Sequence, residues 1–500
     1  MTPRMRILVA VLALLWPSAR FAPAQEPPPS RATARGRAID VRYPSIGDGK
    51  AIDGRVYVML VPKGSRGEPR FGPDWFQPQP MFSREVKGWK PGESIRLDAT
   101  AAGYPAPLDA IEGGEYVAQA IVRINPDTAR IGNGEGNLYG PAVPIKLGAK
   151  DASPLTLEVD RRVPPREFRE TDRVKLAEVE SPLLSRFFGR PVKHRAAVIL
   201  PESRPERKLP AVYIIPGFGG DHFMATRVLG TDRMSQGKDM VRVLLDPDCY
   251  TGHHVFADSA TNGPRGKAFI EEFIPYLESN FPILAEPRAR LLNGHSSGGW
   301  SSLWLQVTYP DVFGGTWSTS PDPVDFRDFQ QVDIYAPNQN IYRDAAGERR
   351  PVARRNGKPM IFYDDFSKLE EAMGPGGQLG SFEAVFSPRR DGKPARLWDR
   401  ATGAIDPEVA KAWEAYDIRL VLERNWAEKA PKLKGKLHVI TGGDDTFYLE
   451  GAVKRLKECL TRLGSDAVIE IIPGRDHGTI LDRALAERIN REMNAATGLK

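Results

Sequence analysis

Residues 291–300 read Leu291-Leu292-Asn293-Gly294-His295-Ser296-Ser297-Gly298-Gly299-Trp300 and contain the pattern G-x-S-x-G. An apolar run precedes the pattern, and a helical pattern over 299–309 follows it. This strand–turn–helix context is typical of a nucleophile elbow, where a serine occupies a strained turn and glycines prevent clashes between strand and helix. The stretch therefore predicts Ser296 as a nucleophile. The alternative is a glycine-rich turn with an incidental serine.

The sequence around this elbow predicts an α/β fold. From about residue 165 onward, short apolar runs alternate with amphipathic helical stretches. Fully apolar strands indicate a mostly parallel sheet covered by helices on both faces. The predicted strands are 196–200, 211–215, 241–245, 290–292, 315–317, 437–441 and 468–472, and the predicted helices are 266–280, 299–309, 450–463 and 481–494.

Residues 322–435 interrupt this alternation. The segment is polar and rich in Pro and Gly, with one good helix predicted over 407–426. An interruption of this length in a compact domain is usually functional, so we expect a lid or cap. Its many aromatic side chains either form a substrate pocket or make up the segment's own core.

The N-terminal part has a different pattern. Residues 39–165 contain short strand-like runs, such as 55–61 and 116–124, separated by clusters of Pro and Gly. This pattern predicts a β-sandwich-like, all-β domain over 39–165, before the α/β domain over 166–500. Residues 25–38 are predicted to be a flexible lead-in.

Residues 1–24 have the three-part layout of a secretory signal. Two arginines precede an apolar run over 7–16, and Ala22-Pro23-Ala24 resembles a cleavage site. We expect a signal peptide cleaved after Ala24 and a secreted or periplasmic protein. No later segment has 18 consecutive apolar residues, so no membrane span is predicted.

The composition limits the number of domains and the classes of partner. With 500 residues, 41% of them hydrophobic and 27% charged, the chain is a folded protein of two or three domains. The net charge of +6 falls to +3 without the signal, because residues 1–24 contain three Arg and no acidic residue. This near balance does not favour a nucleic-acid partner. The two cysteines, Cys249 and Cys459, exclude a disulfide framework, and they either pair or stay free.

A serine nucleophile needs a base, and the order expected in this fold class is Ser, then acid, then His. Only two of the seven histidines, His438 and His477, follow Ser296. His438 lies inside an apolar strand and is interpreted as a core residue. His477 lies in a loop after the last predicted strand, which favours it as the base.

The acid is expected after a strand between Ser296 and His477. The strand 437–441 is followed by Gly442-Gly443-Asp444-Asp445, so both carboxylates are candidates for orienting the imidazole.

Two backbone N–H groups are expected to bind the oxyanion. One is that of Ser297, directly after the nucleophile. The other is expected from the glycine-rich loop after strand 211–215, where Phe218 is preferred and Gly219 is the alternative. This loop lacks the glycine spacing of a phosphate-binding loop.

A metal site is a weaker alternative. His253 and His254 could ligate a cation together with Asp246 and Asp248, but no H-E-x-x-H pattern or Cys cluster supports zinc. No metal or other cofactor is therefore predicted. The two histidines are instead candidates for lining the acyl or leaving-group pocket.

Five collinear stretches carry a family resemblance. They are Tyr213-Ile214-Ile215-Pro216-Gly217-Phe218-Gly219-Gly220, Val255-Phe256-Ala257-Asp258-Ser259-Ala260-Thr261-Asn262-Gly263-Pro264, Gly294-His295-Ser296-Ser297-Gly298-Gly299, Gly443-Asp444-Asp445-Thr446-Phe447 and Gly474-Arg475-Asp476-His477-Gly478. Through them, residues 170–500 resemble the putative-esterase (esterase D-like) family of α/β-hydrolases, close to enterochelin esterase-like and feruloyl or acetylxylan esterase domains.

The resemblance implies a serine esterase that hydrolyses a carboxylic ester through an acyl-enzyme. It favours Asp445 over Asp444, because Asp445-Thr446-Phe447 aligns with the family's acid. Pro216-Gly217 departs from the family's usual His-Gly. The substrate is expected to be a small-molecule or polysaccharide-linked ester. An acyltransferase similar to the mycolyltransferases and a non-catalytic binding protein with a degenerate hydrolase domain are the alternatives. The sequence leaves open the specific ester, the roles of the N-terminal strands and of 322–435, and the oligomeric state.

Overall fold

The computed structural model describes residues 36–44, 49–148, 154–203, 207–229 and 235–499. Residues 36–500 belong to one compact unit. The predicted signal peptide, residues 1–24, and the lead-in up to residue 35 lie outside the described residues and stay predictions.

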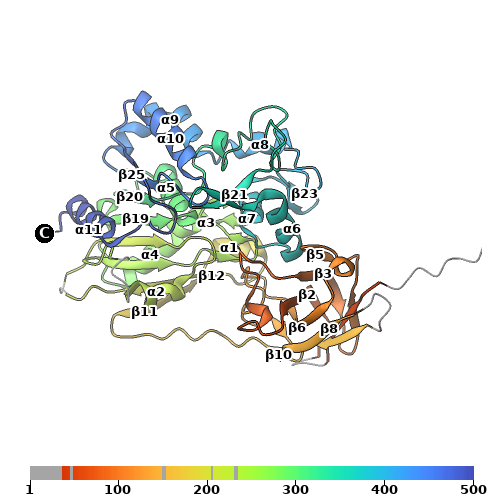
Figure 1. Ribbon diagram of the computed structural model, residues 1–500. Coiled ribbons are helices and arrows are strands. Elements are labelled where there is room, and N and C mark those ends of the chain that lie inside the picture. The colour runs from red at the N-terminus through yellow and green to blue at the C-terminus, as the bar shows by residue number, and fades with distance from the viewer. Residues whose placement is uncertain (1–35, 45–48, 149–153, 204–206, 230–234, 500) are drawn as a thin grey trace, which may run out of the picture. The chain divides into compact units, whose positions relative to one another are not determined.

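An eight-stranded sheet organises the C-terminal part (Figure 1). Its strands from β14 to β26 run parallel, whereas β11 and β12 pair antiparallel at one edge and β12 pairs antiparallel with β14. This is the mostly parallel sheet that the apolar runs predict, with β11 as an additional strand. The spatial order is β11 (Val174–Glu180), β12 (Lys193–Ile199), β14 (Val241–Leu245), β13 (Ala211–Ile215), β19 (Arg290–His295), β20 (Gly315–Thr319), β25 (Leu437–Gly442) and β26 (Val468–Ile472).

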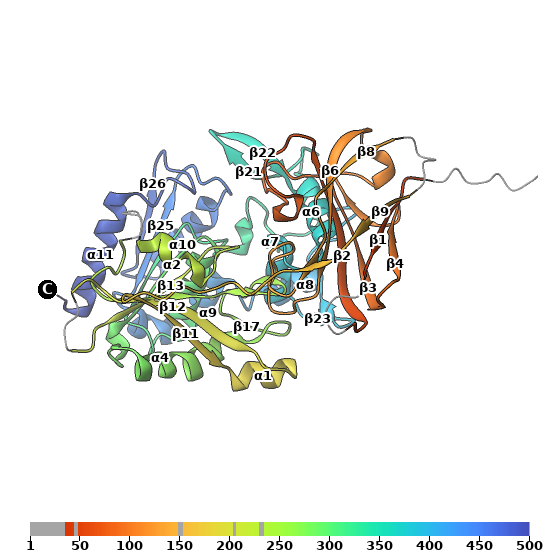
Figure 2. The ribbon, with the colours of Figure 1, turned by 90° about the horizontal axis from the view of Figure 1, so that it is seen from below.

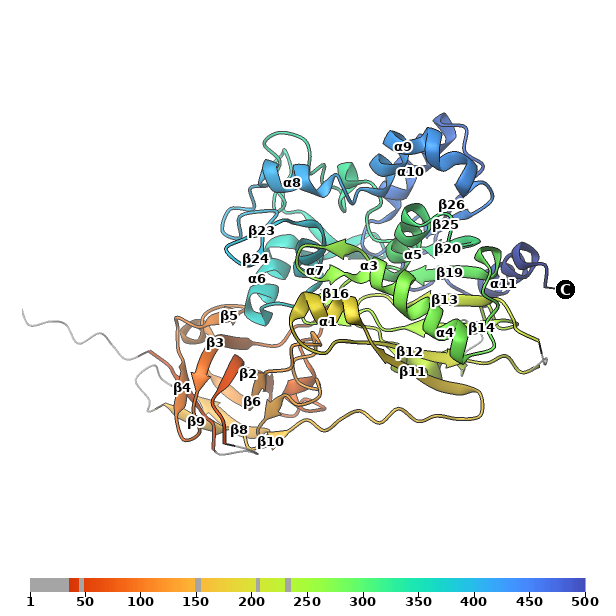
Figure 3. The same cartoon turned by 180° about the vertical axis from the view of Figure 1, so that it is seen from behind.

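Helices cover both faces of this sheet, because alternate side chains of each strand point to opposite sides. In β13, Val212 and Ile214 pack with α2 and α11, whereas Tyr213 and Ile215 pack with α4 and α5. Figure 3 shows α4 and α5 beside β13 and β19. The helices are α1 (Pro182–Phe188), α2 (Ala225–Leu229), α3 (Arg265–Ala268), the π-helix η5 (Phe269–Phe273), α4 (Ile274–Asn280), α5 (Ser297–Thr308), α10 (Glu450–Arg462) and α11 (Arg483–Thr497). The helix predicted over 266–280 is thus α3, η5 and α4 in succession.

The segment between β20 and β25 contains four α-helices, so the prediction of one good helix over 407–426 is wrong. That stretch is broken at Asp417, whose side chain accepts the backbone N–H of Leu420 and starts a new helix. The helix over 378–386 is buried on most sides, so its sequence shows little helical periodicity. The elements are β21 (Pro351–Arg355), β22 (Lys358–Phe362), α6 (Tyr363–Met373), α7 (Gln378–Phe386), β23 (Arg389–Arg390), β24 (Lys393–Pro394), α8 (Pro407–Trp413) and α9 (Ile418–Leu433).

Most aromatic side chains of this segment form its own core. Phe326, Phe329, Trp398 and Trp413 are buried in one cluster together with side chains of α10 and β25. This agrees with the second of the two interpretations offered for them, apart from the few that reach the cavity described below.

Residues 39–162 form strands in two sheets (Figure 2, red to orange). Side chains from both sheets, including Val41, Val58 and Val122, share one hydrophobic cluster. One sheet has the order β4 (Ser94–Leu97), β1 (Ile39–Arg42), β9 (Leu155–Glu158). The other has the order β10 (Arg161–Arg162), β7 (Leu138–Tyr139), β6 (Gly114–Arg123), β2 (Ile52–Pro62), β3 (Met81–Trp89), β5 (Ala102–Tyr104), with β8 (Val143–Leu147) paired to β6. The domain boundaries at 39–165 and 166–500 stay predictions.

Short elements complete the chain. They are η1 (Pro69–Phe71), η2 (Leu108–Ala110), η3 (His222–Met224), β15 (Asp248–Cys249), β16 (Gly252–His253), β17 (Asp258–Ser259), β18 (Gly263–Pro264), η6 (Pro287–Ala289) and η7 (Phe326–Asp328). Cys249 and Cys459 are both free and buried. Within the described ranges, none of the helices combines the length and the apolar character needed to cross a bilayer.

Candidate active site

Ser296 lies in the sharp turn between β19 and α5. Its backbone has φ +60° and ψ −126°, a conformation that side-chain-bearing residues rarely adopt. A Cβ atom on Gly294 would lie 2.0 Å from the carbonyl oxygen of Gly298, and one on Gly298 would lie 1.9 Å from that of Ile215. The turn therefore has the geometry of a nucleophile elbow, and both flanking positions require glycine.

His477 and Asp445 are hydrogen-bonded to each other. The distance between His477 Nδ1 and Asp445 Oδ2 is 2.9 Å, and the Asp445 side chain is fully buried. Asp444, the other acid considered, is exposed, and its backbone N–H donates to the carbonyl of Arg475. Adjacent side chains in the loop after β25 point in different directions, and Asp445 is the one that faces the imidazole.

The loop that carries Asp445 is fixed from two sides. The backbone N–H of Phe447 donates to Asp445 Oδ1 at 2.9 Å. The Nε of Arg354, on β21, donates to the Asp445 carbonyl oxygen at 3.0 Å, and Arg354 also pairs with Glu450 at 2.7 Å. The segment 322–435 thus helps to hold the acid beside the imidazole.

The electrostatics of the pair favour a charged carboxylate and a basic imidazole. Burial disfavours the protonated imidazolium of His477, but the charge and hydrogen bond of Asp445, with the charge of Asp322, outweigh it and raise the pKa of His477. Burial likewise disfavours the Asp445 carboxylate, but His477 and the Phe447 N–H outweigh that effect and lower the pKa of Asp445. His477 is therefore suited to accept a proton near neutral pH.

The loop 216–220, which was predicted to supply an oxyanion donor, forms a wall of the cavity that contains Ser296. Gly217, Phe218 and Gly219 all line it. His253 Nε2 lies 2.9 Å from the Pro216 carbonyl oxygen, which fixes the start of the loop. Ser297, the other predicted donor, is the first residue of α5, and its side chain is fully buried.

The cavity around Ser296 is large and mostly apolar. Its volume is about 470 Å³, and His477 opens onto it as well. Its remaining lining residues come from the end of β19, the N-terminal part, the segment 322–435 and the loop after β25: they are His295, Trp75, Asp322, Pro323, Gln330, Val352, Phe366, Gln378, Leu379, Phe382, Phe447 and Leu449. Apolar cavities of this size with a few polar groups are typical of sites for small organic ligands.

Asp322 is a second buried carboxyl group near Ser296, and it is not among the site residues predicted from the sequence. Its Oδ2 accepts a hydrogen bond from Ser297 Oγ at 2.5 Å and one from Gln378 Nε2 at 3.3 Å. Burial raises the pKa of Asp322 to about 6, although these two hydrogen bonds oppose the shift. Asp322 follows β20 by three residues, at the sheet edge where Ser296 lies, and that position was the signal available in the sequence.

Three of the other histidines, His438, His253 and His254, lie outside this cavity. His438 stacks on Trp317 with ring centroids 4.5 Å apart, as expected for a packed residue. His253 lines a smaller cavity beyond Phe218, and His254 lines the charged cavity described next. In the part of the chain that the structure describes, no three His, Cys, Asp or Glu side chains are arranged to hold a metal ion.

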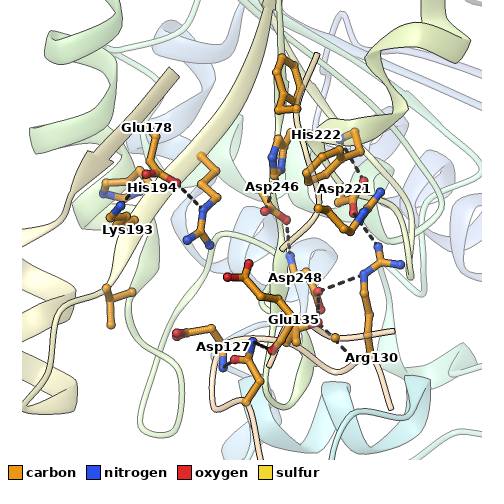
Figure 4. A pocket seen from close by; sticks show the side chains of 18 of the residues that line it. Asp127, Arg130, Glu135, Glu178, Lys193, His194, Asp221, His222, Asp246 and Asp248 are labelled. Atoms are coloured by element: carbon orange, nitrogen blue, oxygen red, sulfur yellow. Dashed lines mark hydrogen bonds and ion pairs between the residues drawn. The ribbon is translucent and has the colours of Figure 1, made fainter. Parts of the chain in front are cut away.

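A second cavity, of about 540 Å³, is lined by Asp221 and His222, which directly follow the loop 216–220 (Figure 4). Many of its charges are paired: Arg130 with Asp221 at 2.8 Å, and Lys193 with Glu178 at 2.5 Å. Because these charges neutralise one another, the cavity does not favour a strongly charged ligand. The residues labelled in Figure 4 are Asp127, Arg130, Glu135, Glu178, Lys193, His194, Asp221, His222, Asp246 and Asp248.

Comparison with known proteins shows the family to which the C-terminal part of the chain belongs. The family model described as "Putative esterase" matches residues 188–477. The protein named Esterase Rv1288, from Mycobacterium tuberculosis, is 30% identical over 155 residues, which are 30% of this chain and 34% of that protein. The match thus spans about a third of the length of that curated relative.

Two solved structures can be compared with the chain. FphF, a fluorophosphonate-binding serine hydrolase of Staphylococcus aureus, is 16% identical with a TM-score of 0.40, over 65% of this chain and 99% of that chain. A ferulic acid esterase from Anaeromyces mucronatus is 16% identical with a TM-score of 0.32, over 67% of this chain and 94% of that chain. Similarity at this level decides neither the substrate nor the mechanism.

Proposed function

The chain belongs to the Putative esterase family, and from this premise we propose that it hydrolyses carboxylic esters with a triad of Ser296, His477 and Asp445. The observation that carries the proposal is the 2.9 Å contact between His477 and Asp445 in a cavity shared with Ser296, which stands at positive φ. A nucleophile, a base and an oriented acid are the parts that acyl transfer requires.

The reaction begins when Ser296 Oγ attacks the ester carbonyl carbon while His477 Nε2 takes the serine proton. The tetrahedral intermediate collapses to an acyl-enzyme, and His477 gives the proton to the departing alcohol. Water then attacks the acyl-enzyme, with His477 again as the base, and releases the carboxylic acid and free Ser296. Asp445 holds the imidazole in one tautomer and stabilises its protonated form.

The oxyanion of each tetrahedral intermediate is proposed to accept hydrogen bonds from the backbone N–H groups of Phe218 and Ser297. Phe218 belongs to the loop that lines the cavity, and Ser297 begins α5 beside the nucleophile. Backbone donors fixed in this way are worth about 3 kcal/mol each in acyl transfer.

The substrate is proposed to carry an acyl group larger than acetyl. A cavity of about 470 Å³ with walls of Phe366, Phe382 and Phe447 offers an apolar surface that an acetyl group leaves mostly empty. Feruloyl esters, one of the classes suggested by the family resemblance, present an aromatic ring of suitable character. Hydrolysis of p-nitrophenyl acetate, p-nitrophenyl butyrate and methyl ferulate tests the proposal. The two p-nitrophenyl esters share a leaving group, and we expect the acetate to have the lower kcat/KM of the two; we also expect methyl ferulate to be hydrolysed.

The pH dependence of hydrolysis follows from the protonation of His477. The neutral imidazole is the base, and its pKa is raised, so a larger fraction is protonated and inactive at neutral pH. We expect kcat/KM to increase with pH, with a midpoint above about 6.5 and a tenfold change per pH unit on the acid side. If kcat/KM for p-nitrophenyl butyrate stays constant from pH 5 to 8, the assignment of His477 as the base is contradicted.

Export is proposed on the sequence of residues 1–24. The arginines, the apolar run and Ala22-Pro23-Ala24 form the layout of a cleaved secretory signal. We expect the full-length chain, expressed in a bacterium, to yield a mature protein that begins at Gln25 and is found outside the cytoplasm. N-terminal sequencing of the purified protein tests this, and an intact start at Met1 contradicts it.

A further inference from the structure

Trp75 lies in the long connection between β2 and β3, far from the hydrolase residues in sequence. The backbone N–H groups of Phe76 and Gln77 both donate to Asp74 Oδ1 at 2.8 Å, and Gln79 Oε1 accepts the N–H of Asp74 at 3.2 Å. These bonds form a tight turn around Trp75 and fix the backbone from which its side chain projects.

The indole of Trp75 contacts three aromatic rings of the active-site cavity. Ring centroids lie 5.5 Å from Phe218, 5.1 Å from Phe366 and 6.2 Å from Phe447. These rings belong, respectively, to the loop 216–220 (called the oxyanion loop below), to α6 and to the loop that carries Asp445. Trp75 therefore lines the same cavity as Ser296 and His477, although it comes from the N-terminal strands.

The strands that carry this connection are held on α6 by hydrogen bonds. The carbonyl groups of residues 371–373, the last of α6, accept from Arg55 Nη2 at 3.0 Å, Ser83 Oγ at 2.5 Å and Tyr57 Oη at 2.7 Å. Carbonyls at a helix C-terminus lack partners within the helix, so these three side chains satisfy them. Because Tyr57 and Ser83 are buried, their hydrogen bonds to α6 are shielded from water, and breaking them would leave buried polar groups without partners.

A second contact joins the N-terminal strands to the oxyanion loop. Arg130, which follows β6, donates to the carbonyl oxygen of Gly219 at 3.1 Å and pairs with Asp221 at 2.8 Å. The connection after β6 thus supports the loop from outside the cavity, while Trp75 packs on Phe218 from inside it.

We propose that Trp75 is a specificity-determining residue, whose indole forms a wall of the acyl pocket and selects esters with a large apolar or aromatic acyl group. The inference rests on the proposed function, because it names the class of ester that binds in the cavity around Ser296. If Trp75 has this role, the N-terminal strands complete the substrate site and do not act as an independent binding module. An aromatic acyl ring against Trp75, Phe366 and Phe447 gains both burial and edge-to-face contacts.

The test compares two esters that share a leaving group, p-nitrophenyl acetate and p-nitrophenyl 3-phenylpropanoate, so that the kcat/KM ratio isolates the acyl group. Trp75→Ala is expected to lower the ratio of phenylpropanoate to acetate about tenfold, the size of one lost aromatic contact. Trp75→Phe is expected to restore most of the ratio. Phe76→Ala is the matched control, because Phe76 is the next residue in the same turn and is exposed. An unchanged ratio in Trp75→Ala, or an equal loss on both esters, overturns the proposal.

A binding measurement separates this inference from the proposed function. In a Ser296→Ala background, calorimetry with 3-phenylpropanoate, the carboxylate product, is expected to show about tenfold weaker binding when Trp75 is also replaced by Ala. Trp75-dependent binding without hydrolysis by the wild type would support the inference and contradict the proposed triad. The opposite outcome is hydrolysis by the wild type while neither 3-phenylpropanoate binding nor the kcat/KM ratio changes when Trp75 is replaced. That outcome would contradict the inference and leave the proposed function intact. Trp75→Phe keeps both readouts available should the alanine variant fail to fold.

Discussion

Replacing Ser296 by Ala is expected to lower kcat for p-nitrophenyl butyrate by about 10⁶-fold, to the limit of detection. The hydroxyl is the atom that forms the acyl-enzyme, and no neighbouring group can take its place in a mechanism that requires a covalent intermediate. The fold should survive, because alanine keeps the Cβ that the strained turn at φ +60° already accommodates. Release of p-nitrophenolate measures the rate, and the melting temperature reports on folding.

Ser279→Ala is the matched control for this substitution. Ser279 is an exposed serine on α4 whose hydroxyl donates to the carbonyl of Pro275, so its loss should leave hydrolysis unchanged. Hydrolysis by folded Ser296→Ala at more than about a hundredth of the wild-type rate would remove Ser296 from the mechanism. A folded wild type that hydrolyses none of the three test esters would speak for the binding-protein alternative.

Asp445→Asn is expected to lower kcat by about 10⁴-fold, the second largest effect. An amide at this position donates where the carboxylate accepts, so it favours the imidazole tautomer that cannot take the serine proton. The substitution also removes the charge that raises the pKa of His477, so the remaining activity should extend to lower pH. Initial rates across pH 5 to 9 measure both effects.

Asp444→Asn provides an internal comparison, because the two acids are neighbours with the same chemistry. Asp444 is exposed, and its replacement should change kcat by no more than about twofold. If Asp444→Asn proves the more damaging substitution, then the solution structure of this loop differs from the one described and the acid must be reassigned.

The elements that the sequence predicts well are those whose local pattern matches their environment. Strands β13, β14 and β26 agree with prediction at both ends, because each is a mostly apolar run that stops before Pro216, Asp246 or Pro473. The elbow is equally local, since strand, turn and helix follow one another within about 20 residues. For such features no distant contact is needed to decide the conformation.

The choice between Asp444 and Asp445 shows where local information stops. Both residues satisfy the rule of an acid after a parallel strand, and only the direction of each side chain separates them. That direction is set by Arg354 and by the N–H of Phe447, and the first of these comes from nearly a hundred residues earlier in the chain. In the sequence, therefore, only the family resemblance favours Asp445, because no local pattern distinguishes it from Asp444.

Trp75 could not be assigned to the site from sequence at all. It lies in a Pro-rich connection whose pattern indicates only a turn, and its role depends on contacts between β2, β3 and α6 that have no local signature. The helix α7 escaped prediction for another reason: it is buried on most sides, so the alternation of polar and apolar faces that identifies a helix is weak there.

The scattered origin of the cavity has a consequence for how the protein folds. Its wall joins Trp75, Phe218, Ser296, Gln378 and His477, which are spread over most of the chain. Bringing such distant residues together costs loop-closure entropy, and contacts of long sequence separation form slowly. A refolding chain can therefore complete the parallel sheet and the elbow while the cavity still lacks its N-terminal wall. Recovery of turnover on bulky esters would then report the last docking event, whereas recovery of helical circular dichroism would report the earlier ones.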